Sequence, residues 1–193
     1  MYVRGAKKRE EVWLLEEIER LDLDEAAFRS REYVIALDEE TGEKAGFGRL
    51  RVHEDAVELT SLGVVEEWRG QGVAAHVVER LVDHASDEDA AVVYALAPEP
   101  NYLLQFGFEP VERAVLPEPL QTRLDVKRNH RTNEVLGMAL AVEAFSVPDR
   151  LRERFKSASP TAETEETGET IPAEEFGIDS DTATYKYDTR GRQ

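Results

Sequence analysis

The residues with the clearest chemical potential form a glycine-containing turn, RGQGVA at residues 69–74. An apolar strand is predicted before it, over 57–65, and after it apolar side chains recur with the 3.6-residue period of a helix. Amides in the first turn of a helix lack intrahelical partners, and the helix dipole adds partial positive charge there. The turn therefore predicts an anion site, with a phosphate-bearing cofactor as the first hypothesis.

The elements before the turn are predicted to form an antiparallel meander, because short polar segments join three successive strands. We expect, in chain order, a strand at 1–4, a helix at 10–21, a short helix at 23–31 with Asp24 as its N-cap, and strands at 33–37, 45–53 and 57–65.

The elements after the turn complete a mixed sheet. The apolar run 91–97 predicts a buried strand, and the helix between it and strand 57–65 implies a parallel pair joined by a right-handed crossover. A short helix at 99–106, a strand at 108–111, a helix at 120–129 and a last strand at 137–144 follow. The predicted fold class is α/β (α+β), a mixed sheet flanked by helices, within one domain over residues 1–154.

The composition changes beyond that domain. Residues 155–170 contain SASPTAETEETGET, which has almost no apolar side chains and predicts an acidic, disordered linker. Residues 171–193 regain Ile, Phe and Tyr, and we expect a tail that docks on the domain or engages a partner.

Composition excludes several classes of function. With 41 acidic against 24 basic residues and a net charge of −17, the chain repels phosphate backbones, so nucleic acid is not an expected partner. The same charge predicts a halophile's high-salt cytoplasm, or an ordinary acidic surface. The absence of cysteine excludes disulfides, thiolate metal sites and a cysteine nucleophile. The four histidines lack ligand spacing and no apolar run is long enough for a bilayer, so we expect no metal, no membrane and a cytoplasmic location.

The turn fits the pattern R-x-x-G-x-A and matches neither a Walker loop nor a dinucleotide fingerprint. A second motif, YLLQFGF at 102–108, follows the predicted central strand. With the order of elements over residues 1–147, these motifs resemble the GNAT superfamily of N-acetyltransferases. The resemblance implies acetyl-CoA as cosubstrate and a central parallel strand pair that splays apart to receive the pantetheine arm.

The resemblance also implies the cofactor contacts. Amides of the turn would bind the pyrophosphate, and an amide of the preceding strand, that of Val64, would polarise the thioester carbonyl. The alternative is a tight strand–helix connection without a ligand. The cofactor-binding residues predicted in this way are Leu62, Val64, Val65, Arg69, Gly70, Gln71, Gly72, Val73 and Ala74.

Two residues are candidates for proton transfer. Glu58 is the predicted general base, a carboxylate in an apolar strand whose burial would raise its pKa, although an outward-facing position is equally open. Many family members place a proton-donating tyrosine where this chain has Leu103. The neighbouring Tyr102 either reaches the leaving sulfur or packs in the core.

The predicted reaction is acetyl transfer to a primary amine of a small molecule or peptide by direct attack. A catalytically silent CoA-binding module, with a regulatory or interaction role, is the alternative. The segment 111–120 resembles acetyltransferases of the N-acetylglutamate synthase type, which implies an amino-acid acceptor; a homodimer is left open. Residues that would then hold its carboxylate, unless they form ordinary surface pairs, are Arg113, Arg123, Lys127 and Arg128.

Overall fold

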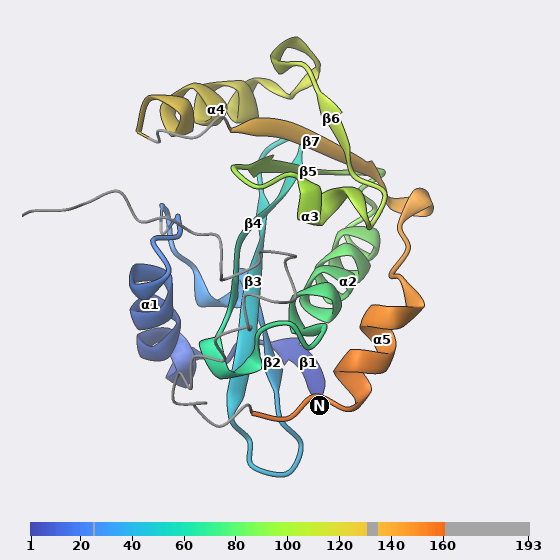
Figure 1. The fold of residues 1–193 in the computed structure, drawn as a ribbon. Coiled ribbons are helices and arrows are strands. Elements are labelled where there is room, and N and C mark those ends of the chain that lie inside the picture. The colour runs from blue at the N-terminus through green and yellow to red at the C-terminus, as the bar shows by residue number, and fades with distance from the viewer. Residues whose placement is uncertain (25, 131–134, 161–193) are drawn as a thin grey trace, which may run out of the picture. The chain divides into compact units, whose positions relative to one another are not determined.

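The computed structural model describes residues 1–24, 26–130 and 135–160, which fall within a first compact unit, Met1–Ala162. Its core is a seven-stranded sheet in the order β1-β2-β3-β4-β5-β7-β6 (Figure 1). The strands are β1 Tyr2–Gly5, β2 Tyr33–Leu37, β3 Lys44–Val52, β4 Val57–Val64, β5 Val92–Ala97, β6 Glu109–Val111 and β7 Leu136–Ala141. The α-helices are α1 Glu11–Arg20, α2 Val73–Asp87, α3 Asn101–Leu104, α4 Glu118–His130 and α5 Asp149–Lys156.

The predicted α/β class and strand directions are confirmed. Strands β1 to β4 form an antiparallel meander, β4 and β5 run parallel, and β7 lies antiparallel to both β5 and β6. Helix α2 makes the crossover between the parallel strands, as its apolar stripe predicts. Figure 1 shows β5 and β7 running across the direction of β3 and β4.

The change of direction begins where β4 and β5 part. Their described pairs extend only from Val57 to Leu59 on β4. Just beyond, Ser61 and Leu62 lie opposite the single residue Gly48 of β3, which is a β-bulge, and Ser61 takes a left-handed φ of 49°. The rest of β4 therefore faces the gap between the diverging strands with unpaired backbone, as the expected splay requires.

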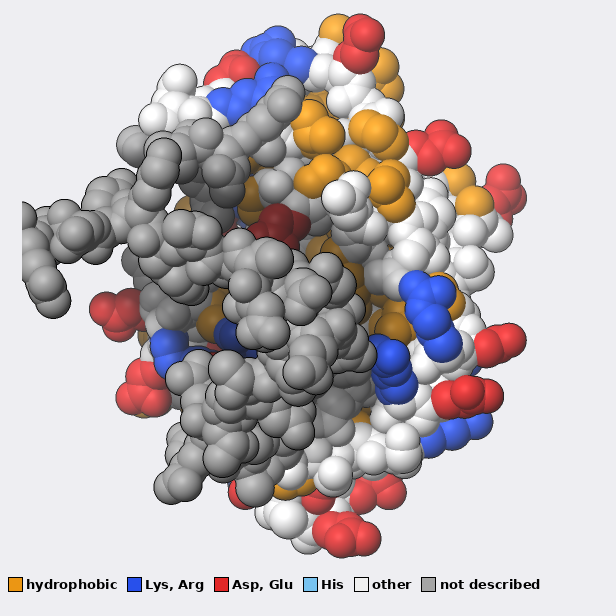
Figure 2. Space-filling view, viewed as in Figure 1, with side chains coloured by type: hydrophobic (Ala, Val, Ile, Leu, Met, Phe, Trp, Pro, Cys, Tyr) orange, Lys and Arg blue, Asp and Glu red, His pale blue; other side chains and the backbone are white. Residues whose placement is uncertain are grey.

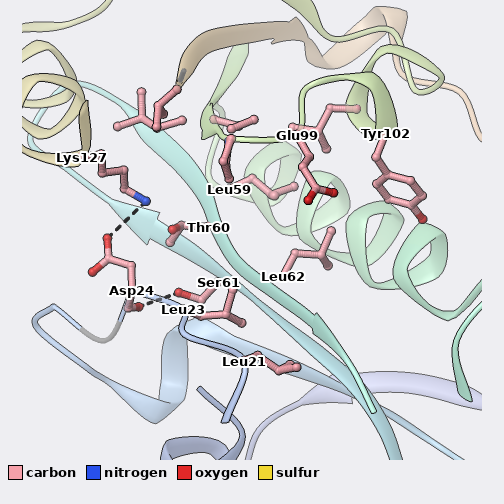
Figure 3. A pocket seen from close by; sticks show the side chains of 16 residues that line it. Leu21, Leu23, Asp24, Leu59, Thr60, Ser61, Leu62, Glu99, Tyr102 and Lys127 are labelled. Carbon is pink, nitrogen blue, oxygen red and sulfur yellow. Dashed lines mark hydrogen bonds and ion pairs between the residues drawn. The ribbon is translucent and has the colours of Figure 1, made fainter. Parts of the chain in front are cut away.

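Helices cover both faces of the sheet. Helix α1 packs on one face of β2 and β3 through Leu14 and Ile18, and α2 and α5 lie on the other (Figure 1). Helix α4 packs separately near the end of β5, through Leu120 and Leu124 against Leu96. The gap between β4 and β5 is thus flanked by α2 and α3 on one side and by the 21–32 loop and α4 on the other (Figures 1 and 3).

The predicted helix at 23–31 is wrong. The described part of this segment consists of turns and a single 3-10 turn, Ser30–Glu32. Buried Arg49 of β3 donates hydrogen bonds to the carbonyls of Ala26 and Ala27, which a helix would need for its own bonds, and Ala27 has a left-handed φ of 51°. Asp24 does not cap a helix; its carboxylate accepts a hydrogen bond from the Ala26 amide in a local turn.

The ordered domain continues past the predicted boundary at Arg154. Helix α5 runs to Lys156, Phe155 is 8% exposed and stacks on His76 of α2, and Ser159 exchanges hydrogen bonds with the side chain of Gln71. Residues 155–160 are therefore part of the folded unit. The remainder of the predicted linker and the whole predicted tail at 171–193 lie outside the described residues.

Candidate active site

The predicted anion site has the backbone geometry that its sequence implies. Gly70 and Gly72 have left-handed φ values of 73° and 78°, and Gly72 is the N-cap of α2 with no side chain capping the helix. The first turn of α2 therefore presents amides without intrahelical partners. A cavity of about 330 Å³ lies against this turn and is lined by Val64, Trp68, Arg69, Gly70, Gly72, Val73, Ala74, Tyr102, Gln105, Arg150, Leu151 and Arg154.

The two glycines of the turn serve different purposes. A Cβ on Gly72 would lie 2.3 Å from the carbonyl oxygen of Leu151, so α5 packs directly on this position. A Cβ on Gly70 would meet nothing within 4 Å, so only its φ requires glycine. The backbone at Gly70 is thus open for the close approach of a ligand.

The free edge of β4 leads from this turn to a second cavity. The Val65 amide donates to the carbonyl of Ala45 on β3, at 3.0 Å, so this amide is not available to a cofactor. Because successive amides of a strand point in opposite directions, the Val64 amide faces the gap towards β5. Leu62 belongs to the bulge, which the ladder to β3 leaves unpaired. Val64 lines the cavity at the turn, whereas Leu62 lines the second one.

The second cavity has a volume of about 380 Å³ and opens between β4, the end of β5 and α4 (Figure 3). Its charged lining residues are Asp24, Glu99 and Lys127. Lys127 Nζ lies 3.5 Å from Asp24, while the Glu99 side chain reaches into the pocket beside Tyr102, across from Leu62 (Figure 3). The cavity therefore combines a carboxylate directed inward with an ion pair at its far wall.

Glu58 is buried beneath this arrangement and does not line the cavity. Its side chain is 0% exposed, and both carboxylate oxygens lie near Arg123 of α4, at 2.9 and 3.2 Å from Nε and Nη2. His53 Nε2 lies 3.0 Å from Oε2. Burial raises the pKa of Glu58, but the His53 hydrogen bond and the Arg123 charge outweigh it, so the net shift is downward. Of the two positions that the sequence left open for Glu58, the structure has the buried one, and its pKa is lowered where burial alone would raise it.

Tyr102 lines both cavities. Burial raises its pKa to about 12, and its hydroxyl is protonated at neutral pH, as that of an unshifted tyrosine also is. Leu103, in the family's usual tyrosine position, is 6% exposed and belongs to the core. Tyr102 also packs edge-on against Phe106, so it contributes to packing as well as to the site.

The four cations predicted to hold an acceptor carboxylate separate into two groups. Arg113 pairs with Asp125 on the exposed side of α4, and Arg128 donates to the carbonyl of Val135. Lys127 lines the second cavity, whereas Arg123 lines a neighbouring hollow beside residues 22–24; both contact Asp24. Of the four cations, only Lys127 therefore lines one of the two cavities described above.

Three residues that line the cavities were not predicted from the sequence: Glu99, Arg150 and Arg154. Glu99 follows directly after the apolar strand, in the sequence ALAPEP. Ligands commonly bind beyond the carboxyl ends of parallel strands, so this position could have been recognised from the sequence. The arginines occur in a helix that the sequence analysis had not predicted, and no local pattern connects them with the turn.

The described residues provide neither a cluster of metal ligands nor a helix suited to span a membrane. Among residues 1–24, 26–130 and 135–160, no group of three His, Cys, Asp or Glu side chains could hold a metal ion. None of the helices in the same ranges combines the length and the apolar character needed to cross a membrane.

Comparison with known proteins agrees with the geometry. Residues 4–108 match the model of the acetyltransferase (GNAT) family. N-acetylglutamate synthase from Neisseria gonorrhoeae, solved with coenzyme A and N-acetyl-glutamate, has a TM-score of 0.62 at 16% identity, over 73% of this chain and 35% of that one. Rv2747 from Mycobacterium tuberculosis, solved with CoA and NLQ, has a TM-score of 0.63 at 20% identity, over 73% of this chain and 99% of that one.

A third structure, an acetyltransferase of the GNAT family from Staphylococcus aureus Mu50, gives a TM-score of 0.54 at 10% identity, over 73% of this chain and 98% of that one. At these identities the solved structures support the fold alone, and the chain spans about a third of the Neisseria enzyme. The family model covers more than half of the sequence and includes both motifs. The chain therefore belongs to the GNAT family of acetyltransferases, which use acetyl-CoA as cosubstrate.

Proposed function

We propose that this protein transfers an acetyl group from acetyl-CoA to an amine of a small molecule or peptide by direct attack. The observation that carries the proposal is that Tyr102 lines two neighbouring cavities. One cavity borders the pyrophosphate-type turn, and the other holds a carboxylate directed inward. Such a pair of cavities fits a cosubstrate that enters from one side and an acceptor that enters from the other.

When bound, acetyl-CoA supplies a thioester carbonyl for attack and a thiolate as leaving group. In this proposal the Leu62 amide donates a hydrogen bond to the carbonyl oxygen as it gains negative charge. We assign the second cavity, between β4, the end of β5 and α4, to the acceptor and call it the acceptor cavity. We favour Leu62 over the predicted Val64, because Leu62 lines the acceptor cavity and Val64 lines the cavity at the turn. Tyr102 lines both cavities, and its hydroxyl, which is protonated at neutral pH, donates the proton that the departing sulfur takes.

The acceptor amine must lose a proton, and two carboxylates compete for this role. Glu58, the base predicted from sequence, is held by Arg123 and His53, so Arg123 would have to release it before it could accept a proton. Glu99 is exposed and directed into the cavity (Figure 3). We therefore assign proton abstraction to Glu99 and give Glu58 the task of anchoring α4 over the acceptor cavity.

The acceptor cavity favours an amine with a second polar group. Asp24 and Glu99 attract a protonated amine, and Lys127 supplies a cation that an acceptor carboxylate could approach. An amino-acid α-amine meets both conditions, and the Neisseria and Mycobacterium structures are described with N-acetyl-glutamate and NLQ respectively. We propose amino acids as the first acceptors to examine.

The test is thiol release from acetyl-CoA across a panel of amino acids, polyamines and peptides, followed by substitutions of the two carboxylates. Glu99→Gln should lower kcat about 100-fold without changing Tm or the affinity for acetyl-CoA. Glu58→Gln should instead destabilise the fold, because it weakens the contacts with Arg123 and His53. Tight CoA binding without turnover on any amine would instead favour the silent CoA-binding module.

A further inference from the structure

Helix α5 places two arginines against the turn at the N-terminus of α2. Arg150 and Arg154, one helical turn apart, both line the 330 Å³ cavity that contains Gly70, Gly72 and the first residues of α2. Figure 2 shows Lys and Arg side chains gathered where, in Figure 1, α5 lies beside the start of α2. No recognised part of the glycine motif includes this helix, which lies about eighty residues further along the chain.

The position of α5 is determined by its packing against α2 and the turn. Leu151 and Phe155 are buried in the core, Phe155 stacks on His76, and the Leu151 carbonyl lies against Gly72. Arg152 joins the helix to α2 through an ion pair with Glu79, at 2.7 Å. These contacts hold α5 beside the turn, where Arg150 and Arg154 line the cavity together with Leu151.

The partners of these two arginines are unusual for such an acidic chain. Arg150 donates to the Gln105 side-chain carbonyl at 2.8 Å, and Arg154 donates to the Gly70 carbonyl at 3.3 Å. Within the part of the chain that the structure describes, neither forms an ion pair with a carboxylate, although the net charge is −17. Two guanidinium groups that lack a described counter-ion therefore converge on the place where backbone amides already favour an anion.

We propose that Arg150 and Arg154 bind the diphosphate of acetyl-CoA, so that α5 forms one wall of the cosubstrate site. A guanidinium group presents a planar fork of donors that matches phosphate oxygens and is always charged. The turn and α5 would then hold the diphosphate from two sides, through amides and arginines respectively. This inference rests on the proposed acetyl-CoA site and adds a charged contact that the glycine turn does not contain.

The experiment measures the affinity of the full chain for CoA, dephospho-CoA and pantetheine by calorimetry. The Arg150→Gln/Arg154→Gln double variant should bind CoA about 10–100-fold more weakly, since charge-assisted hydrogen bonds are lost, and bind dephospho-CoA with the same penalty. Its affinity for pantetheine, which has no diphosphate, should be unchanged. The slope of log Kd against log salt should also become shallower.

Arg152→Gln is the matched control, because it removes a charge from the same helix on the face that pairs with Glu79. It should leave the affinity for CoA unchanged. Replacing both Arg150 and Arg154 by lysine keeps the charge but loses the forked donors of the guanidinium group, and should restore only part of the affinity for CoA.

Three results would overturn the inference alone: CoA affinity within twofold of wild type in the double variant, equal weakening of pantetheine, or an equal loss in Arg152→Gln. A penalty that disappears with dephospho-CoA would overturn the diphosphate assignment, because it would place the contact at the 3′-phosphate. Wild-type protein that binds no CoA would refute the proposed function itself, and this outcome is distinct from the other four.

Discussion

The ion pair between Arg123 of α4 and Glu58 of β4 offers the sharpest test of how the acceptor side is held together. The Arg123→Leu substitution removes the cation and keeps an apolar stem of similar length. Among the described residues, Glu58, which is 0% exposed, would then keep a hydrogen-bond contact only with His53. The perturbation therefore leaves a buried carboxylate without its arginine partner, and it also removes the contact of Arg123 with the less buried Asp24.

The size of the effect follows from the burial of both partners. The Arg123 side chain is 16% exposed and Glu58 is 0% exposed, so solvent can do little to replace the lost contact. Breaking a buried pair by removing one partner costs about 3–5 kcal/mol of unfolding free energy. For a domain of this size that corresponds to a fall in Tm of roughly 6–20 °C.

The loss should depend on pH in a defined direction. In the wild type the pKa of Glu58 is lowered, so its contribution to stability is present above the unfolded-state pKa and is lost as the pH falls through the folded value. Without Arg123, burial is opposed chiefly by the His53 hydrogen bond, so we expect the pKa of Glu58 to rise relative to the wild type. The deficit of the variant then shrinks as Glu58 becomes protonated, so it should be larger at pH 7 than at pH 5.

Urea unfolding at both pH values, followed by circular dichroism, measures this deficit. Arg113→Leu is the control, because it removes an arginine that pairs with Asp125 at the exposed side of α4, and it should change stability little. The Glu58→Leu/Arg123→Leu double variant should be more stable than Arg123→Leu alone. A deficit below about 1 kcal/mol, or the same deficit at pH 5 and pH 7, would refute the reasoning.

Three other predictions follow from the site. Gly72→Ala should destabilise the domain more than Gly70→Ala. Both substitutions place alanine at a left-handed φ, at a cost of about 1–2 kcal/mol, but only the Cβ at position 72 would also clash with α5. Equal losses of stability on thermal unfolding would contradict this. Tyr102→Phe should lower kcat about 10–100-fold at unchanged affinity for CoA, and unchanged turnover would remove the hydroxyl from the mechanism. Ending the chain after Arg154 should lower Tm more than ending it after residue 160, because Phe155 is lost from the core; matching Tm values would argue that its packing is unimportant.

Much of the fold could be predicted because its elements have strong local patterns. The stripe of α2, the apolar run of β5 and the polar turns of the meander each indicate one type of structure; the short connections predict the meander, and the helical crossover predicts the parallel pair. The position of β7 between β5 and β6 was not predicted. The 23–31 segment was wrongly predicted to be a helix because the interaction that competes with helix formation is a tertiary contact. Arg49, more than twenty residues away, takes the carbonyls that a helix would use.

The candidate site likewise has one part that local sequence predicts and another that depends on tertiary contacts. The anion-binding turn is a local property, since glycines at two left-handed positions before a helix suffice to define it, and the sequence by itself determined both the turn and the family. Whether Glu58 is a free base or an anchored carboxylate depends on Arg123, 65 residues away, and only the tertiary structure decided this. The Arg154 contact with Gly70 spans 84 residues. Charges separated so far along the chain leave no periodic signal, because their interaction energy depends on distance and burial in space, which only the folded chain specifies.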